Sequence, residues 1–378
     1  MRFVKRFAIP MAAAAGVVVL AGAPPVSGAE ADWRKVPHSS AEGTLKDVAV
    51  LGGSDAWAVG EKHPPYESAE PVAEHWDGTS WKEVPVPDTP TGTGSLDGVS
   101  AVASNDVWAV GDSTGLGPVI RHWDGAVWTA VQPAAPPDGA HVGADRLNDI
   151  AAVSKTLAWA VGSFSDRTTP GPVTLVERWD GAKWSRMTSP NPGRLSNTLQ
   201  GVASLSATNA WAVGWYLSDA GNNVALVLHW DGRTWTRSPA TLPSGNTELQ
   251  SVTAVSAKNV WAVGNHEGRP LVMHWNGTRW RVLPEPALTQ SWLSTAAPDG
   301  RGGVWVGGYR MTDGGVTSRP LFLHWNGTAW TTGTSEEAEG TVEGLTRVGT
   351  SIWAVGTTSP CTCFVAPPLV EVNGPLPQ

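Results

Sequence analysis

Several residue types are scarce in this 378-residue sequence, and their scarcity limits the functions that the protein can have. It holds two cysteines, three tyrosines and five phenylalanines, and charged residues make up only 16% of the chain. Acidic residues outnumber basic ones, so the formal net charge is −8, and no Lys- or Arg-rich run offsets this excess. A surface of this kind repels nucleic acid and anionic membranes, so we expect neither as a partner.

Long apolar runs are confined to the start of the chain. A basic beginning is followed by the mostly apolar segment Phe7–Leu20 and then by small residues, which is typical of a secretory signal peptide. We predict that residues 1–29 are this signal, with cleavage after Ala29 or Ala31. No later run is long enough to anchor the chain in a membrane. The mature protein is therefore expected to be extracellular, secreted and monomeric.

Tryptophan and glycine are abundant instead, with 22 and 43 copies, and the tryptophans recur at fixed spacing. A second marker, His-Trp-(Asp/Asn)-Gly-x-x-Trp, is clearest at His75–Trp81. The first marker is Trp-Ala-Val-Gly or a close variant, and its tryptophans are Trp57, Trp108, Trp159, Trp211, Trp261, Trp305 and Trp353. A period near 50 residues in Gly-rich, strand-like segments is typical of a β-propeller with one four-stranded blade per repeat.

The first repeat divides into four short strands. We expect them at Leu45–Val50, Ala56–Val59, Pro71–Trp76 and Trp81–Val86, bounded by turn-forming residues. The sequence thus predicts an all-β, seven-bladed β-propeller over residues 30–378, with four antiparallel strands per blade. The predicted blades are 45–86, 96–132, 147–188, 199–240, 249–284, 293–333 and 342–374.

Ring closure can also be predicted. The last repeat stops at Asn373-Gly374 and lacks the outer-strand tryptophan that follows the second marker in the other six repeats. Near the N-terminus, Trp-Arg-Lys-Val-Pro at 33–37 matches Trp-Lys-Glu-Val-Pro at 81–85. We therefore expect the N-terminal strand to complete the seventh blade, which leaves no free sheet edge there.

The intervals between markers separate two faces of the ring. The second-marker tryptophan and the outer-strand tryptophan lie five residues apart in all six repeats that have both. By contrast, the interval between first and second markers varies, and so does the connection to the next blade. Turns of constant length meet at one end of an up-and-down blade and the variable connections at the other. Binding is expected on the variable face, because loops on a rigid scaffold commonly carry it.

Trp-Ala-Val-Gly, followed by His-Trp-Asp-Gly-x-x-Trp and Lys-Glu-Val-Pro, resembles the kelch repeat over residues 33–374. The chain looks like a secreted bacterial kelch-like propeller, similar to the central domain of galactose oxidase. It departs from kelch because the glycine doublet is clear only at Gly307-Gly308 and because Trp replaces Tyr. The resemblance implies a fold rather than an activity.

Most repeated residues are expected to be structural. Tryptophans at repeating positions suit packing between blades, and the Asp-Gly and Asn-Gly pairs suit hairpin turns. The second-marker histidines are spread around the ring rather than converging, with Arg178 and Glu371 in their place in the third and seventh repeats. We therefore assign no catalytic residue, no metal ligand and no cofactor.

The residues that break the repeat are the candidates for ligand binding. All are predicted to lie on the variable face, where aromatic and arginine side chains are common in recognition sites; the alternative is that they only cover loop backbones. The candidates are Trp215, Tyr216, Trp292, Tyr309, Arg310, Tyr66, Phe164 and Arg269.

The only two cysteines, Cys361 and Cys363, also fall in a variable connection. In an exported protein a bridge between them is the expectation, with copper binding or pairing between chains as alternatives.

We interpret the chain as a secreted, non-catalytic binding protein for a glycan, peptide or surface partner. Two alternatives stand beside this interpretation: an extracellular carbohydrate-active enzyme (hydrolase, lyase or oxidase) and a structural, envelope-associated scaffold.

Overall fold

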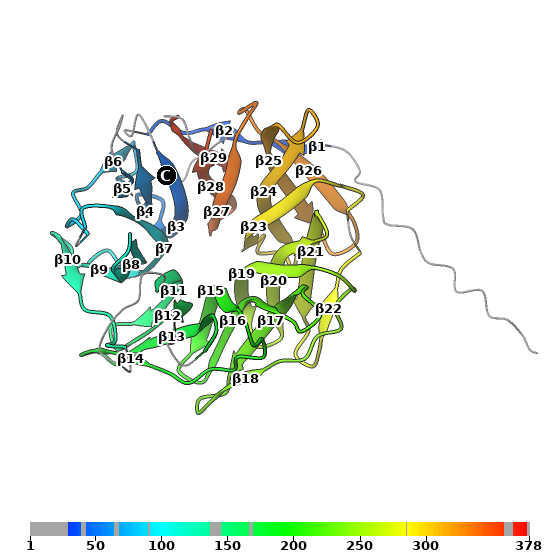
Figure 1. The fold of residues 1–378 in the computed structure, drawn as a ribbon. Coiled ribbons are helices and arrows are strands. Elements are labelled where there is room, and N and C mark those ends of the chain that lie inside the picture. The colour runs from blue at the N-terminus through cyan, green and yellow to red at the C-terminus, as the bar shows by residue number, and fades with distance from the viewer. Residues whose placement is uncertain are drawn as a thin grey trace, which may run out of the picture.

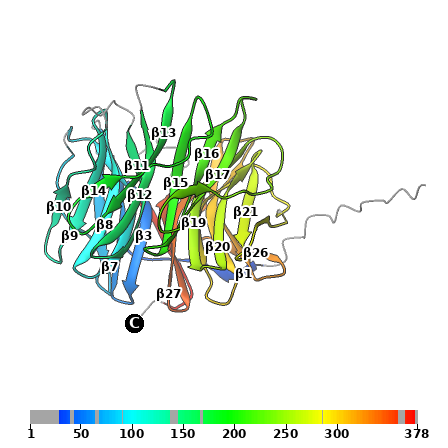
Figure 2. The same ribbon diagram turned by 90° about the horizontal axis from the view of Figure 1, so that it is seen from below.

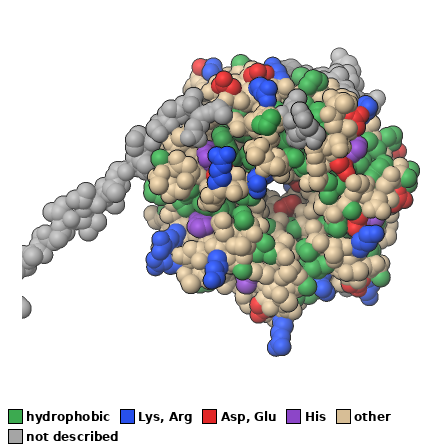
Figure 3. All heavy atoms as spheres, turned by 180° about the vertical axis from the view of Figure 1, so that it is seen from behind, with side chains coloured by type: hydrophobic (Ala, Val, Ile, Leu, Met, Phe, Trp, Pro, Cys, Tyr) green, Lys and Arg blue, Asp and Glu red, His purple; other side chains and the backbone are tan. Residues whose placement is uncertain are grey.

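The computed structural model describes residues 29–375 except 39–42, 64–67, 90, 137–144, 166–168, 285 and 359–365. The described chain is all-β: 29 strands form seven sheets arranged in a ring (Figure 1). In side view the inner strands run between two faces of a short cylinder (Figure 2). The space-filling view shows a hollow at the centre of the ring, here called the channel (Figure 3). Within the described residues, no helix is long and apolar enough to cross a membrane.

Each blade orders its strands from the channel outward. The innermost strands are β3 (Thr44–Gly52), β7 (Gly94–Ala103), β11 (Arg146–Ser154), β15 (Asn197–Ser206), β19 (Thr247–Ser256), β23 (Ser291–Pro298) and β27 (Thr341–Val348). The second strands are β4 (Asp55–Lys62), β8 (Asp106–Ser113), β12 (Leu157–Ser165), β16 (Asn209–Leu217), β20 (Asn259–His266), β24 (Val304–Thr312) and β28 (Ser351–Thr357).

The third strands are β5 (Glu70–Trp76), β9 (Gly117–Trp123), β13 (Pro172–Trp179), β17 (Asn223–Trp230), β21 (Arg269–Trp275), β25 (Thr317–Trp325) and β29 (Pro368–Asn373). The outer strands are β6 (Trp81–Glu83), β10 (Trp128–Val131), β14 (Trp184–Arg186), β18 (Trp235–Arg237), β22 (Trp280–Val282), β26 (Trp330–Thr334) and, for the seventh blade, β2 (Arg34–Lys35). The predicted seven-bladed fold is confirmed.

The N-terminal strand closes the ring, as predicted. β2 pairs antiparallel with β29, placing Arg34 opposite Val372. A further strand, β1 (Ala29–Asp32), was not predicted; it pairs in parallel with β26 of the sixth blade. Between these two strands lies Trp33, fully buried, with its ring stacked on Phe322 at 3.8 Å and edge-on to Trp305 at 5.5 Å. The N-terminus therefore joins blades six and seven.

The turns of constant length lie together at one end of the blades, here called the turn face. A Cβ atom added to Gly78, in the turn between β5 and β6, would meet Ser54, in the turn between β3 and β4. The indole of Trp76 spans the same two turns, since its Nε1 donates to the carbonyl of Gly53 at 2.9 Å. The opposite end, which carries the variable connections, is here called the loop face.

Tryptophans fill the spaces between blades. Trp57 of blade one lies 4.8 Å from Trp123 of blade two and meets Trp128 edge-on at 5.2 Å, measured between ring centroids. The same arrangement recurs around the ring and seals the closing junction, where Trp353 contacts Trp76 and Trp81. Buried aromatic rings bring a large apolar area and specific geometry, which explains the repeat.

The seventh blade differs from the expected register by one residue. In the first blade Trp57 lies opposite His75, but Trp353 lies opposite Val372 and not Glu371. Val372 therefore occupies the histidine position, and Asn373 occupies the position of the second-marker tryptophan. Marker intervals alone gave the wrong register because the variable connection before the third strand hides a one-residue difference.

Candidate binding site at the channel mouth

The seven inner strands each place one polar side chain at the loop-face mouth of the channel. In every blade this residue directly follows the first buried leucine or valine of the inner strand. The ring consists of Lys46, Asp97, Asn148, Gln200, Gln250, Ser294 and Glu343, and it lines a cavity of about 660 Å³. These residues were not among the sequence candidates. The sequence does carry a signal for them, because this position is polar in all seven repeats and always follows a leucine or valine.

Charged groups dominate the part of the mouth built by blades one to three. The ammonium of Lys46 lies 2.8 Å from a carboxylate oxygen of Asp97 and 3.4 Å from one of Glu61. The hydroxyl of Ser95 donates to Asp97 at 2.9 Å and to Asp112 at 3.3 Å. Desolvation and the neighbouring Asp97 carboxylate raise the pKa of Asp112. This side of the mouth is therefore a hydrogen-bonded network of charges.

Aromatic rings occupy the part of the mouth built by blade six. Trp292 on β23 and Tyr309 on β24 are cross-strand neighbours whose rings stack at 5.3 Å with an interplanar angle of 14°. Both are half-buried, and Tyr309 lines the cavity. Burial, followed by the nearby carboxylate of Glu343, raises the pKa of Tyr309. The phenol is therefore a neutral hydrogen-bonding group at neutral pH.

Two other candidates lie at the loop-face end of blade four. Trp215 on β16 follows the marker glycine just as Tyr309 does on β24, so the two side chains occupy equivalent positions in blades four and six. Neighbouring residues alternate sides along a strand, and Tyr216 packs away from the mouth. Its hydroxyl accepts from Arg237 at 3.0 Å, and the Arg237 guanidinium lies 5.1 Å from its ring centroid. These aromatics belong to strand ends, not to loops.

The remaining candidates do not converge on the mouth. Phe164 lies beneath the guanidinium of Arg186, 4.3 Å from its ring centroid, in a structural contact. Arg310 and Arg269 are exposed, and neither lines the cavity. Tyr66 falls outside the described residues, and so do Cys361 and Cys363, whose predicted bridge stays a prediction.

A second polar layer lies deeper in the channel. Asp47 accepts hydrogen bonds from Val48 N and from Val99 N of the next blade, both at 2.8 Å, and Asp149 links blades three and four in the same way. Although Asp47 keeps partial exposure to the channel, desolvation raises its pKa to about 7. Desolvation and the Asp47 charge raise the pKa of Asp149. Both carboxyls tie neighbouring inner strands together.

The repeated polar residues form hydrogen bonds within the fold. Four of the five second-marker histidines hydrogen-bond to an Asp or Asn that starts the second strand, as His122 does to Asp106 at 2.8 Å, and His324 contacts Asp299 in the turn before that strand. The turn aspartates accept from backbone amides, as Asp124 does from Ala126 and Val127. Among the described residues, no group of three or more His, Cys, Asp or Glu side chains is placed to hold a metal ion.

No protein-family model matches this chain, and no curated protein matches it by sequence. Solved structures match it over most of its length. YCF48 bound to D1 peptide has a TM-score of 0.59 at 15% identity, covering 93% of this chain and 97% of that one. U3-55K has a TM-score of 0.55 at 13% identity, covering 92% and 100%.

A fungal lectin from Aleuria aurantia, described as a six-bladed β-propeller with a novel fucose recognition mode, has a TM-score of 0.50 at 12% identity. The match covers 77% of this chain and 95% of the lectin. The likeness is one of fold. At such identities the β-propeller is shared, and a ligand does not follow from it.

Proposed function

We propose that the protein is a secreted, non-catalytic binding protein that holds a glycan at the channel mouth. The observation that carries this proposal is the stacked pair Trp292–Tyr309 at the edge of a cavity of about 660 Å³. The remaining wall consists of amides, hydroxyls and charged groups. An aromatic surface packs against the apolar C–H face of a sugar ring, while convergent polar groups hydrogen-bond its hydroxyls.

Two further observations support this function. The similar structures include a propeller with a bound peptide and a propeller that is a fucose-binding lectin, so the architecture serves recognition in other proteins. Export rests on the basic, then apolar, start of the sequence. The kelch-like repeat and the abundance of Ala and Gly fit a bacterial propeller.

The charges at the mouth favour binding over catalysis. Asp97 is neutralised by Lys46, and Glu343 accepts from the hydroxyl of Thr341 at 2.7 Å. One observation favours the competing function, an extracellular carbohydrate-active enzyme: the raised pKa of Asp112 is a property of general acids. The experiment below separates the two.

Replacing Trp292 by alanine is expected to weaken glycan binding about 30-fold, because it removes one ring of the stacked pair that holds Tyr309 at the cavity, and losing such an aromatic contact costs about 2 kcal/mol. The measurement is a glycan array with the full-length protein, followed by titration of the best ligand. Arg310→Ala is the matched control: this exposed side chain is one residue from Tyr309 but takes no part in the stacked pair, so the variant should bind as the wild type does.

Equal binding by Trp292→Ala and the wild type would contradict the proposed site. If the array shows no glycan ligand and a peptide binds at the same mouth, the ligand is a peptide and not a glycan. Turnover of a polysaccharide that stops in Asp112→Asn would replace binding by catalysis.

A further inference from the structure

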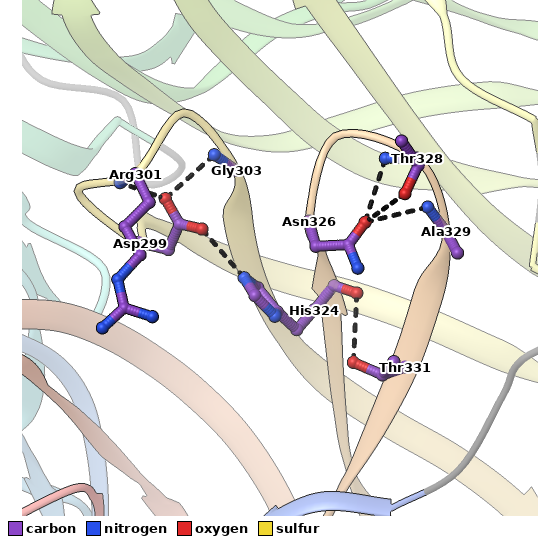
Figure 4. Close-up of polar contacts among 8 residues, drawn as sticks. All are labelled: Asp299, Arg301, Gly303, His324, Asn326, Thr328, Ala329 and Thr331. Carbon is purple, nitrogen blue, oxygen red and sulfur yellow. Dashed lines mark hydrogen bonds and ion pairs between the residues drawn. The ribbon is translucent and has the colours of Figure 1, made fainter.

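A recess opens on the turn face between blades six and seven, at the one junction whose second-marker tryptophan is missing from the sequence. It has a volume of about 350 Å³, and its walls include Trp305, His324, Ile352 and Asn373. Figure 4 shows one side of it, where the Asp299 carboxylate accepts from the amides of Arg301 and Gly303 and contacts His324. These hydrogen bonds outweigh desolvation and lower the pKa of Asp299.

At other junctions an indole fills the corresponding space. At five junctions the second-marker tryptophan of one blade lies 4.8–5.1 Å from the first-marker tryptophan of the blade before it. At the junction of blades six and seven, Asn373 stands in that position. Trp305 is accordingly 7% exposed, whereas the other six first-marker tryptophans are 0–3% exposed. A corresponding recess between blades two and three is smaller, about 290 Å³, and is walled by the indole of Trp179.

The missing indole also leaves hydrogen-bonding groups without their usual partner. In five blades the second-marker indole donates to the first carbonyl of the adjacent turn, at 2.9–3.1 Å. The equivalent carbonyl in blade seven is that of Gly349, which lines the recess, and no indole reaches it. Within the described chain, the buried amide nitrogen of Asn373 has no hydrogen-bond partner.

Two arginines add positive charge to this site. Arg301 and Arg347 line the recess, and neither forms an ion pair with any of the described residues. The Arg347 guanidinium crosses from blade seven and lies against Gly300 of blade six, where it would collide with a Cβ atom. In Figure 4 the side chain of Arg301 turns away from the Asp299 carboxylate. Unpaired guanidinium groups beside a recess suit an anionic ligand.

We propose that this recess binds a planar aromatic ligand that carries a ring N–H and a carboxylate, such as an indole acid. The ring would occupy the space that the indole takes at the other junctions, its N–H facing the Gly349 carbonyl and its carboxylate facing Arg301 and Arg347. The site is independent of the channel mouth, because it lies on the opposite face of the ring and shares no residue with it.

Calorimetric titration with indole-3-acetate tests this inference, with indole and cyclohexylacetate as companion probes. We expect saturable binding of indole-3-acetate, weaker binding of indole and none of cyclohexylacetate. Asn373→Trp restores the repeat and fills the recess, so this variant should lose binding and melt at a higher temperature than the wild type. The double variant Arg301→Glu/Arg347→Glu changes only exposed side chains and should weaken indole-3-acetate at least tenfold while leaving indole unchanged.

Three results would overturn the proposal. The first is no binding of indole-3-acetate by the wild type. The second is unchanged binding by Asn373→Trp, or, if that variant fails to fold, by the double arginine variant. The third is equal affinity for cyclohexylacetate and indole-3-acetate, which would show that the site recognises negative charge and not an aromatic ring.

Discussion

Replacing Trp33 by alanine is expected to lower the free energy of unfolding by about 3–5 kcal/mol, the usual cost of truncating a buried tryptophan. Trp33 has no exposed surface, and it packs on Phe322 and Trp305 of the sixth blade. Its backbone amide also donates to Thr334 at 2.8 Å. The loss therefore falls on the contact that joins the last blade to the one before it.

Chemical denaturation of full-length wild-type and variant protein measures this loss. Trp275→Ala is the matched control, because Trp275 is half-exposed and its removal should cost less. A chain that starts at residue 41 should go further and lose its single cooperative transition, since it lacks β1, Trp33 and β2. Identical melting of the truncated and full-length chains would disprove the role of this closure.

The second large effect is a dependence of stability on pH through Asp47. Its native pKa is raised to about 7 by desolvation, whereas an unfolded aspartate titrates near 3.9. As pH rises above about 4, the unfolded state releases this proton first, so unfolding becomes easier until the native group also ionises. Below about pH 4 the contribution is fully present. It is lost as pH rises through about 7.

The test compares the unfolding free energies of the wild type and Asp47→Asn across this range. The variant has lost one hydrogen-bond acceptor, which changes its free energy of unfolding by the same amount at every pH. The informative quantity is therefore how the difference in unfolding free energy between the two proteins varies with pH. We expect the free energy of unfolding of the wild type to fall steadily, relative to that of the variant, from pH 4 to pH 8. Asp124→Asn serves as control, because backbone hydrogen bonds lower the pKa of this exposed aspartate. Its contribution to stability changes only below about pH 4, so its difference from the wild type should stay flat from pH 4 to pH 8. A flat difference for Asp47 would contradict the raised pKa.

The fold could be predicted largely because packing imposes a period on the sequence. Most junctions need the same indoles at the same positions, and Trp33 repeats the outer-strand tryptophan near the start of the chain, so the closing strand could be predicted from its Trp-Arg-Lys-Val-Pro segment. β1 was not predictable, because its sequence Ala-Glu-Ala-Asp carries none of the repeat's markers and the strand is additional to the four of each blade.

The candidate site was predicted less well than the fold. Selecting the residues that break the repeat identified Trp292 and Tyr309, which the structure brings together. The same criterion also selected Phe164 and Tyr216, whose rings lie against arginines within the protein. A departure from the repeat does not show on which side of a strand the side chain lies. That side determines whether the residue faces the channel mouth or packs within the protein. The ring of polar residues at the channel mouth was missed for the opposite reason. Its members share polarity but mostly not residue type, so their common position becomes evident only when the inner strands are seen to converge.

The N-terminal closure has a consequence for the order of assembly. The sheets of blades one to five consist of consecutive strands, and the sheet of blade six adds only β1 to four consecutive strands, so each of these blades can form its own four strands as soon as its segment is available. The seventh blade has to wait, because its outer strand belongs to the earliest part of the chain and its other three to the latest. A circular permutant that linked residue 375 to residue 29 and opened elsewhere between two blades would remove this delay, and its refolding rate would reveal how much the mismatch slows the natural chain.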